Sequence, residues 1–79
     1  MKDYTSLIKT FCPRLKAVRE AAGIDKKTVA EKLGYGVSNY SSYESKALPS
    51  IERLAQLAEF YGVSTDYLLG LSDQRRAEA

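Results

Sequence analysis

Apolar residues recur at helical spacing along most of the 79-residue chain, in short segments that end at glycine or proline. The clearest face begins at Leu15 and recurs at i, i+3, i+4 and i+7, and Gly23 follows it as a helix stop. The same spacing and stop signals predict helices over residues 14–22, 26–33, 37–45, 51–61 and 65–71. No strand pattern or repeat interrupts this series. The sequence therefore predicts an all-α bundle of five short helices.

Small polar residues mark where several of these helices begin. Asp25 and Ser50 are expected to cap the second and fourth helices, and Ser64 or Thr65 the fifth, because such side chains accept free amide hydrogens. The residues expected on the inner face of the fourth helix are Ile51, Leu54, Ala55, Leu57, Ala58 and Tyr61.

Residues 1–12 form an N-terminal extension that has its own apolar spacing, at Tyr4, Leu7, Ile8 and Phe11. This spacing indicates a possible extra helix, and Pro13 suits the first turn of the helix that follows. The extension is either a flap on the core or a dimer contact, and we favour the flap. Residues 13–71 then form the main domain. Residues 72–79 form a polar C-terminal tail that is expected to fray.

The third predicted helix divides its residues unusually. Tyr40, Tyr43 and Glu44 fall on one side at about 100° per residue. Small polar residues occupy the other side, at positions 38, 41 and 42. A helix that must lie in the groove of a partner needs small side chains on its outer face. With the preceding helix and a tight turn, this pattern is typical of a DNA-binding helix-turn-helix, although a merely solvated face would look similar.

Composition narrows the possible functions. The formal net charge of +2 only weakly favours nucleic acid as a partner. The chain has no histidine, which excludes histidine acid–base catalysis and argues against a zinc site, so we expect no metal, no cofactor and no enzyme. The single cysteine, Cys12, is interpreted as a small buried apolar residue. No apolar run or leader pattern suggests a membrane or secretion, so a cytoplasmic location is expected.

Four segments together resemble one known family. They are RLKAVREAAGI, VAEKLGY, YE and PSIERLAQLAEFYGVSTDYLLG, and they extend from Arg14 to about Gly70. The chain resembles the Cro/CI-type helix-turn-helix proteins, also called the xenobiotic-response-element family, of phage repressors and bacterial regulators. The resemblance implies a lambda-repressor-like fold. It also implies that the third helix enters the major groove while the second crosses the DNA backbone.

The resemblance also implies roles for individual residues. The base-contacting positions match Val37, Ser38 and Ser42, and Ser41 shares their outer face. The candidates for phosphate contacts are Lys26, Lys27, Asn39 and Lys46. Arg19 and Glu44 match a structural salt bridge between the first and third helices, and both stand on otherwise apolar faces.

The chain departs from the family pattern at several positions. The third helix lacks the glutamines and arginines that make strong bidentate contacts with bases. Gly36 stands where a capping Ser or Thr is commoner. Tyr35 replaces a modest aliphatic residue and either packs in the core or extends toward the DNA backbone. The loop from Glu44 to Pro49 is one residue shorter than usual and lacks the usual glycine.

These features lead to one expected function and one alternative. We expect a sequence-specific regulator of transcription that binds double-stranded DNA, a repressor that occupies a palindromic operator as a homodimer. No small-molecule ligand and no membrane are expected. Leu68, Leu69 and Leu71 exceed what a short terminal helix needs, so they divide between the core and a dimer contact. The alternative is an antitoxin-like or phage accessory module that uses the same fold to bind a protein.

Overall fold

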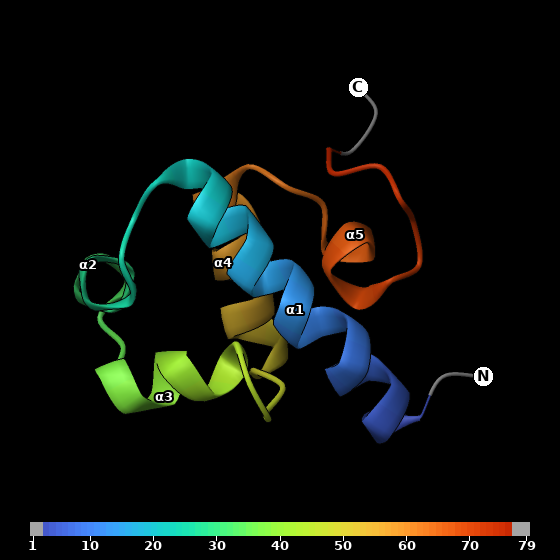
Figure 1. The fold of residues 1–79 in the computed structure, drawn as a ribbon, viewed down its shortest axis with the longest axis horizontal. Helices are drawn as coiled ribbons and strands as arrows, with labels where there is room; N and C mark the ends of the chain where they lie inside the picture. The colour runs from blue at the N-terminus through green and yellow to red at the C-terminus, as the bar shows by residue number, and fades with distance from the viewer. Residues whose placement is uncertain (1–2, 77–79) are drawn as a thin grey trace.

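The chain folds into five α-helices joined by short loops (Figure 1). The computed structural model of the protein describes residues 3–76. The helices are α1 (Tyr4–Ala22), α2 (Lys26–Leu33), α3 (Val37–Tyr43), α4 (Ile51–Tyr61) and α5 (Thr65–Leu69). No strand occurs in residues 3–76, so the predicted all-α class is confirmed. Residues 1–2 and 77–79 of the expected extension and tail lie outside the described residues.

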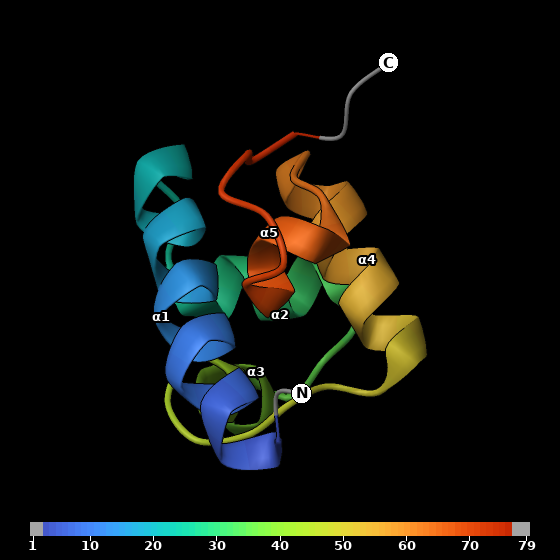
Figure 2. The same cartoon turned by 90° about the vertical axis from the view of Figure 1, so that its right-hand side faces the viewer.

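The helices surround one apolar core. Figure 2 shows α1 and α4 on opposite sides of the molecule, with α5 between them. Every helix contributes at least one fully buried large side chain, and these are Phe11, Leu15, Val29, Tyr40, Leu57 and Leu68. Among the helices of residues 3–76, none has both the length and the apolar character that a membrane span requires.

Three of the predicted helix starts are confirmed by their caps. The side chains of Asp25, Ser50 and Ser64 each accept the backbone N–H of the residue three positions later. These hydrogen bonds satisfy amide groups that have no partner within the helix. Local sequence therefore determines where α2, α4 and α5 begin.

The predicted helix start at Pro13 is wrong, because α1 begins at Tyr4 and passes through the proline without a break. Asp3 caps the helix and accepts the amide of Ser6 at 2.9 Å. Pro13 has no N–H to donate to the carbonyl of Lys9, but both residues are exposed, and at such positions water is the usual partner of a free carbonyl. Burial of the apolar residues on the opposite side of α1 offsets the lost hydrogen bond.

Residues 4–12, which the sequence placed in an N-terminal extension with a possible helix of its own, form the first part of α1 and reach the core through their last residues, whereas residues 3–6 are exposed. Phe11 is fully buried, and Cys12 is 2% exposed. The Cys12 thiol lies 3.6 Å from the carbonyl oxygen of Ala47, in the loop after α3. Burial raises the pKa of this thiol, which agrees with the prediction of a buried apolar role.

The C-terminal segment 72–76 is held against the domain, contrary to the expected frayed tail. Arg14 of α1 donates hydrogen bonds to the carbonyl oxygens of Tyr67 and Ser72, at 2.6 and 2.8 Å. It also pairs with the carboxylate of Asp73 at 3.0 Å. Further along, the carbonyl of residue 75 accepts the backbone N–H of Ser64. The polar composition of the segment suggested fraying. Arg14, which holds the segment, lies more than fifty positions earlier, so local sequence could not show this contact.

The contact between α1 and the end of α5 can be tested at Gly70. This glycine has φ +81°, and a Cβ added there would lie 2.6 Å from Cγ2 of Thr10. We expect Gly70→Ala to lower the free energy of unfolding by roughly 3 kcal/mol. Alanine is strained in the left-handed conformation, and its clash with Thr10 destabilises the folded state further. Urea denaturation measures the loss.

Gly62→Ala is the matched control. Gly62 has φ +68° but nothing within 4 Å of an added Cβ, so only the backbone cost of about 1–2 kcal/mol should remain. Adding Thr10→Ala to Gly70→Ala should remove the clash, so the double variant should lose only about as much stability as Gly62→Ala. Equal losses in the two single variants would show that α1 does not approach Gly70 this closely.

Candidate nucleic-acid interface

Helices α2 and α3 pack against each other and are joined by residues 34–36. Gly34 adopts φ +75°, a left-handed conformation that favours glycine, and so lets the chain turn directly after α2. The amide of Tyr35 donates to the carbonyl of Ala30 at 2.8 Å. Two short helices joined by a three-residue turn with glycine form a helix-turn-helix, visible at the lower left of Figure 1.

A buried ion pair ties α3 to α1. Arg19 donates from Nε and Nη2 to the two carboxylate oxygens of Glu44, at 2.7 and 3.1 Å. Its third nitrogen donates to the carbonyl of Ile24 at 2.9 Å. The side chains are only 12% and 2% exposed, and the hydrogen bonds to Glu44 raise the pKa of Arg19. The expected salt bridge is therefore present, and it fixes the C-terminal end of α3.

Two tyrosines, Tyr40 on the inner side of α3 and Tyr35 in the turn before it, also hold this region against the core. Tyr40 is fully buried, and its hydroxyl lies 2.6 Å from that of Tyr61 on α4. Burial raises the pKa of both phenols, so both remain neutral at physiological pH. Tyr35 is 8% exposed and donates to the side-chain carbonyl of Gln56. Of the two interpretations of Tyr35, the structure therefore shows core packing.

The outer face of α3 comprises Val37, Ser38, Asn39, Ser41 and Ser42. The first three residues are exposed, whereas both later serines are half-buried. The hydroxyl of Ser42 donates to the carbonyl of Asn39 at 2.7 Å, and that of Ser41 accepts from the ammonium of Lys26 at 3.4 Å. The predicted base-contacting residues thus share one face, but they are not equally free to meet a partner.

The predicted phosphate-contacting lysines differ in their surroundings. Lys27 and Lys46 are exposed, whereas Lys26 is half-buried against α3. Lys46 belongs to a loop in which the amides of residues 45, 46 and 47 all donate to the carbonyl of Ser42. No residue other than glycine within 3–76 has a positive φ. The loop therefore turns without the glycine that the family usually has there.

Sequence reasoning missed one residue beside this surface. The guanidinium of Arg53 lies 4.1 Å from the ring centre of Tyr35 and donates to the hydroxyl of Tyr43 at 2.9 Å. Arg53 thus connects the turn, the end of α3 and the start of α4, and the stacked contact adds cation–π stabilisation. The only signal in the sequence was the unusual tyrosine at position 35.

The leucines proposed for a dimer contact separate in the structure. Leu68 is fully buried and is removed from that list, because a side chain enclosed by its own chain cannot contact another. Leu69 is half-buried, and Leu71 is 64% exposed. Ile51 was expected on the inner face of α4 but is 87% exposed. It is the first residue of α4, at an end of the helix where no opposing element covers it.

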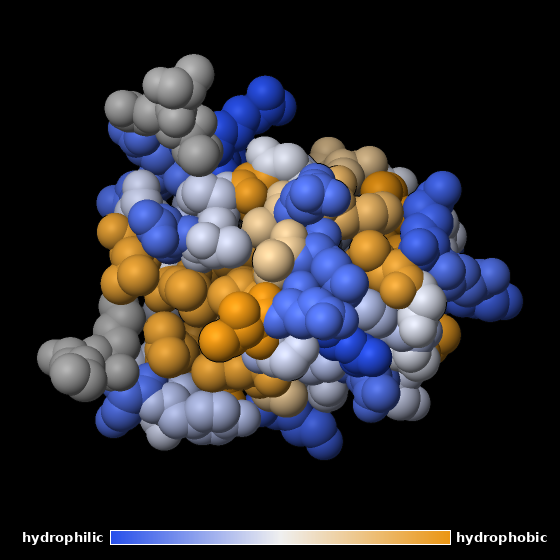
Figure 3. Space-filling view, turned by 180° about the vertical axis from the view of Figure 1, so that it is seen from behind, coloured by the Kyte–Doolittle hydropathy of each residue, from blue (hydrophilic) through white to orange (hydrophobic). Residues whose placement is uncertain are grey.

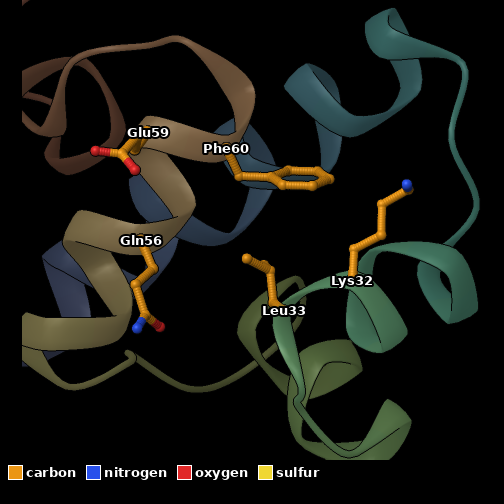
Figure 4. Close-up of a pocket in the computed structure, with 5 residues that line it drawn as sticks. All are labelled: Lys32, Leu33, Gln56, Glu59 and Phe60. Atoms are coloured by element: carbon orange, nitrogen blue, oxygen red, sulfur yellow. The ribbon is translucent and has the colours of Figure 1, made fainter.

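A shallow recess lies between α2 and α4 (Figure 4). Its lining residues are Lys32, Leu33, Gln56, Glu59 and Phe60. None of them belongs to the predicted DNA-contacting set. The recess is therefore a feature separate from the outer face of α3.

Comparison with protein families decides the classification. The model of the helix-turn-helix family matches residues 15–68, which is more than half of the chain. The chain belongs to the helix-turn-helix family. The matched part of this helix-turn-helix protein includes both helices of the motif, the Arg19–Glu44 pair and every buried core residue except Phe11 and Cys12.

Curated relatives of this helix-turn-helix protein occur in Bacillus subtilis (strain 168). The uncharacterized HTH-type transcriptional regulator YobD is 41% identical over 64 residues, covering 80% of this chain and 57% of the relative. The HTH-type transcriptional regulator ImmR is 48% identical over 58 residues, covering 72% and 46%. The SPbeta prophage-derived regulator YonR is 40% identical over 60 residues, covering 75% and 56%. The chain thus spans about half the length of these relatives.

The ion pair can be tested by removing the carboxylate. Glu44→Ala leaves Arg19 buried without its partner, so we expect the free energy of unfolding to fall by roughly 3–5 kcal/mol. Denaturant unfolding measures the change. Glu31→Ala is the control, because Glu31 is exposed and its loss should change stability by no more than about 0.5 kcal/mol. A midpoint for Glu44→Ala equal to that of wild type would contradict the assigned role.

Proposed function

We propose that this chain is a sequence-specific regulator of transcription that binds double-stranded DNA and represses from a palindromic operator as a homodimer. The observation that carries the proposal is the outer face of α3, which has small uncharged side chains on a helix that a buried ion pair holds in place. The family match supports a DNA-binding regulator and not an enzyme. The proposed role would place the chain wherever the DNA is, which is the cytoplasm in a bacterium.

The proposal assigns base contacts to the exposed start of α3. Val37 is 46% exposed and suits the methyl group of thymine, and the hydroxyl of Ser38 suits a polar base edge. Ser41 and Ser42 would come close to the bases, although their hydroxyls already take part in hydrogen bonds within the protein. Exposed Asn39, Lys27 and Lys46 are assigned to phosphates, which orient the protein without reading the sequence.

The apolar surface near α5 supports the proposed homodimer. Figure 3, seen from behind, shows a broad orange area toward the side that carries α5 and the start of α1. Leu71 and Ile51, both largely exposed, follow α5 and begin α4, two helices that pack together. The molecule measures 33 × 30 × 21 Å. Its longer dimensions are thus comparable with the spacing of about 34 Å between half-sites one DNA turn apart, so two copies fit side by side on such a site.

Selection from random DNA tests this function. The wild-type chain is incubated with a pool of random duplexes at about 0.15 M salt, where non-specific contacts are weakened, and the bound fraction is sequenced. We expect an enriched palindrome, because a two-fold dimer presents the same α3 surface to each half-site. Failure to enrich any sequence, with binding that disappears as salt rises, would contradict the proposal and favour the protein-binding alternative.

Two substitutions distinguish base contacts from phosphate contacts. Val37→Ala should alter the preferred base at one position while leaving affinity for random DNA nearly unchanged. Lys46→Ala should weaken binding to all sequences about equally and reduce the slope of log affinity against log salt by about 1. Fluorescence anisotropy with the selected duplex and a scrambled duplex measures both. An equal loss on both duplexes for Val37→Ala would remove Val37 from the base-reading set.

A further inference from the structure

Lys26 occupies a different position from the other lysines of the motif. It is the first residue of α2, yet its Nζ donates to the hydroxyl of Ser41 on the outer face of α3, at 3.4 Å. The side chain is half-buried there, whereas its neighbour Lys27 is exposed. The ammonium group therefore lies beside Ser41, a residue of the surface that is proposed to enter the major groove.

The outer face of α3 has no charge of its own. All seven residues of the helix, VSNYSSY, are uncharged. The hydroxyl of Ser42 donates back to the carbonyl of Asn39, so its proton is not available to a base in this arrangement. The strongest hydrogen-bond donor above this face is consequently the ammonium of Lys26, which comes from another helix.

We propose that Lys26, held in place by Ser41, reads a guanine in the major groove. Guanine presents two acceptors there, O6 and N7, and lysine is a common donor to both. An ammonium has three donors, of which one is used by Ser41 and two remain for these acceptors. The small side chains of α3 leave space for the base edge to approach the ammonium. This inference rests on the proposed function and replaces the phosphate contact expected for Lys26 from the sequence.

The test uses the duplex recovered by selection with the full chain. Each G·C pair of a half-site is replaced in turn, and the guanine is also replaced by 7-deazaguanine, which lacks the N7 acceptor. Affinities are measured by fluorescence anisotropy for wild type, Lys26→Met, Lys27→Ala and Ser41→Ala. Methionine keeps the apolar stem of the lysine without its charge, and thermal melting verifies that each variant is folded.

For wild type, we expect one guanine whose replacement lowers affinity about tenfold, with a smaller loss for 7-deazaguanine. Lys26→Met should bind the original and the altered duplexes equally at that position, while it still discriminates at the others. Lys27→Ala should keep the full discrimination and lose only salt-dependent affinity. Ser41→Ala should reduce the discrimination a few-fold without a change in melting temperature.

Two results would overturn the inference and leave the proposed function standing. One is a selected site in which wild-type affinity depends on no guanine. The other is an equal loss for Lys26→Met on all duplexes together with a salt slope reduced by about 1, which would assign Lys26 to a phosphate. If wild type selects no sequence at all, the proposed function itself fails and the inference fails with it.

Discussion

The position of α3 depends on the buried ion pair between Arg19 and Glu44. A helix of seven residues makes few hydrogen bonds of its own, and α3 also starts at a glycine that provides no side-chain cap. Its geometry must therefore come from contacts with other helices. The guanidinium of Arg19 connects α1, the carbonyl before α2 and the end of α3 through three separate hydrogen bonds. This one side chain thereby holds α1, α2 and α3 in register.

Polar groups inside the domain are paired throughout, which explains how a small core tolerates so many of them. Among the described residues, no buried side-chain nitrogen or oxygen lacks a hydrogen-bond partner. The tyrosines contribute to this pairing: Tyr40 meets Tyr61, Tyr35 meets Gln56, and Tyr43 accepts from Arg53. Because the large rings and their hydroxyls face inward, the outer side of α3 can remain small. The same arrangement of residues thus fills the interior with tyrosine rings and leaves small side chains on the outer side of α3.

Much of the fold could be predicted because its signals are local. Caps such as Asp25 and Ser50, and the periodic apolar faces, depend on residues within one or two turns of each other. The features that were missed depend on distant partners. Pro13 lies inside a helix because of what α1 buries elsewhere, and Arg14 holds a segment nearly sixty residues away. Likewise, spacing could place Lys26 at the start of α2 but could not show that its ammonium rests on Ser41.

The loop after α3 has a consequence for how this domain could change over time. Its turn is closed by three backbone amides that share the carbonyl of Ser42, and no residue in it needs a left-handed conformation. Exposed positions 45 and 46 can therefore accept almost any amino acid without rebuilding the turn. Mutation there could add or remove charge beside the proposed DNA-binding surface and leave α3 undisturbed. Under the proposed function, binding strength and base preference would then evolve as independent traits, one in the loop and the other on the helix.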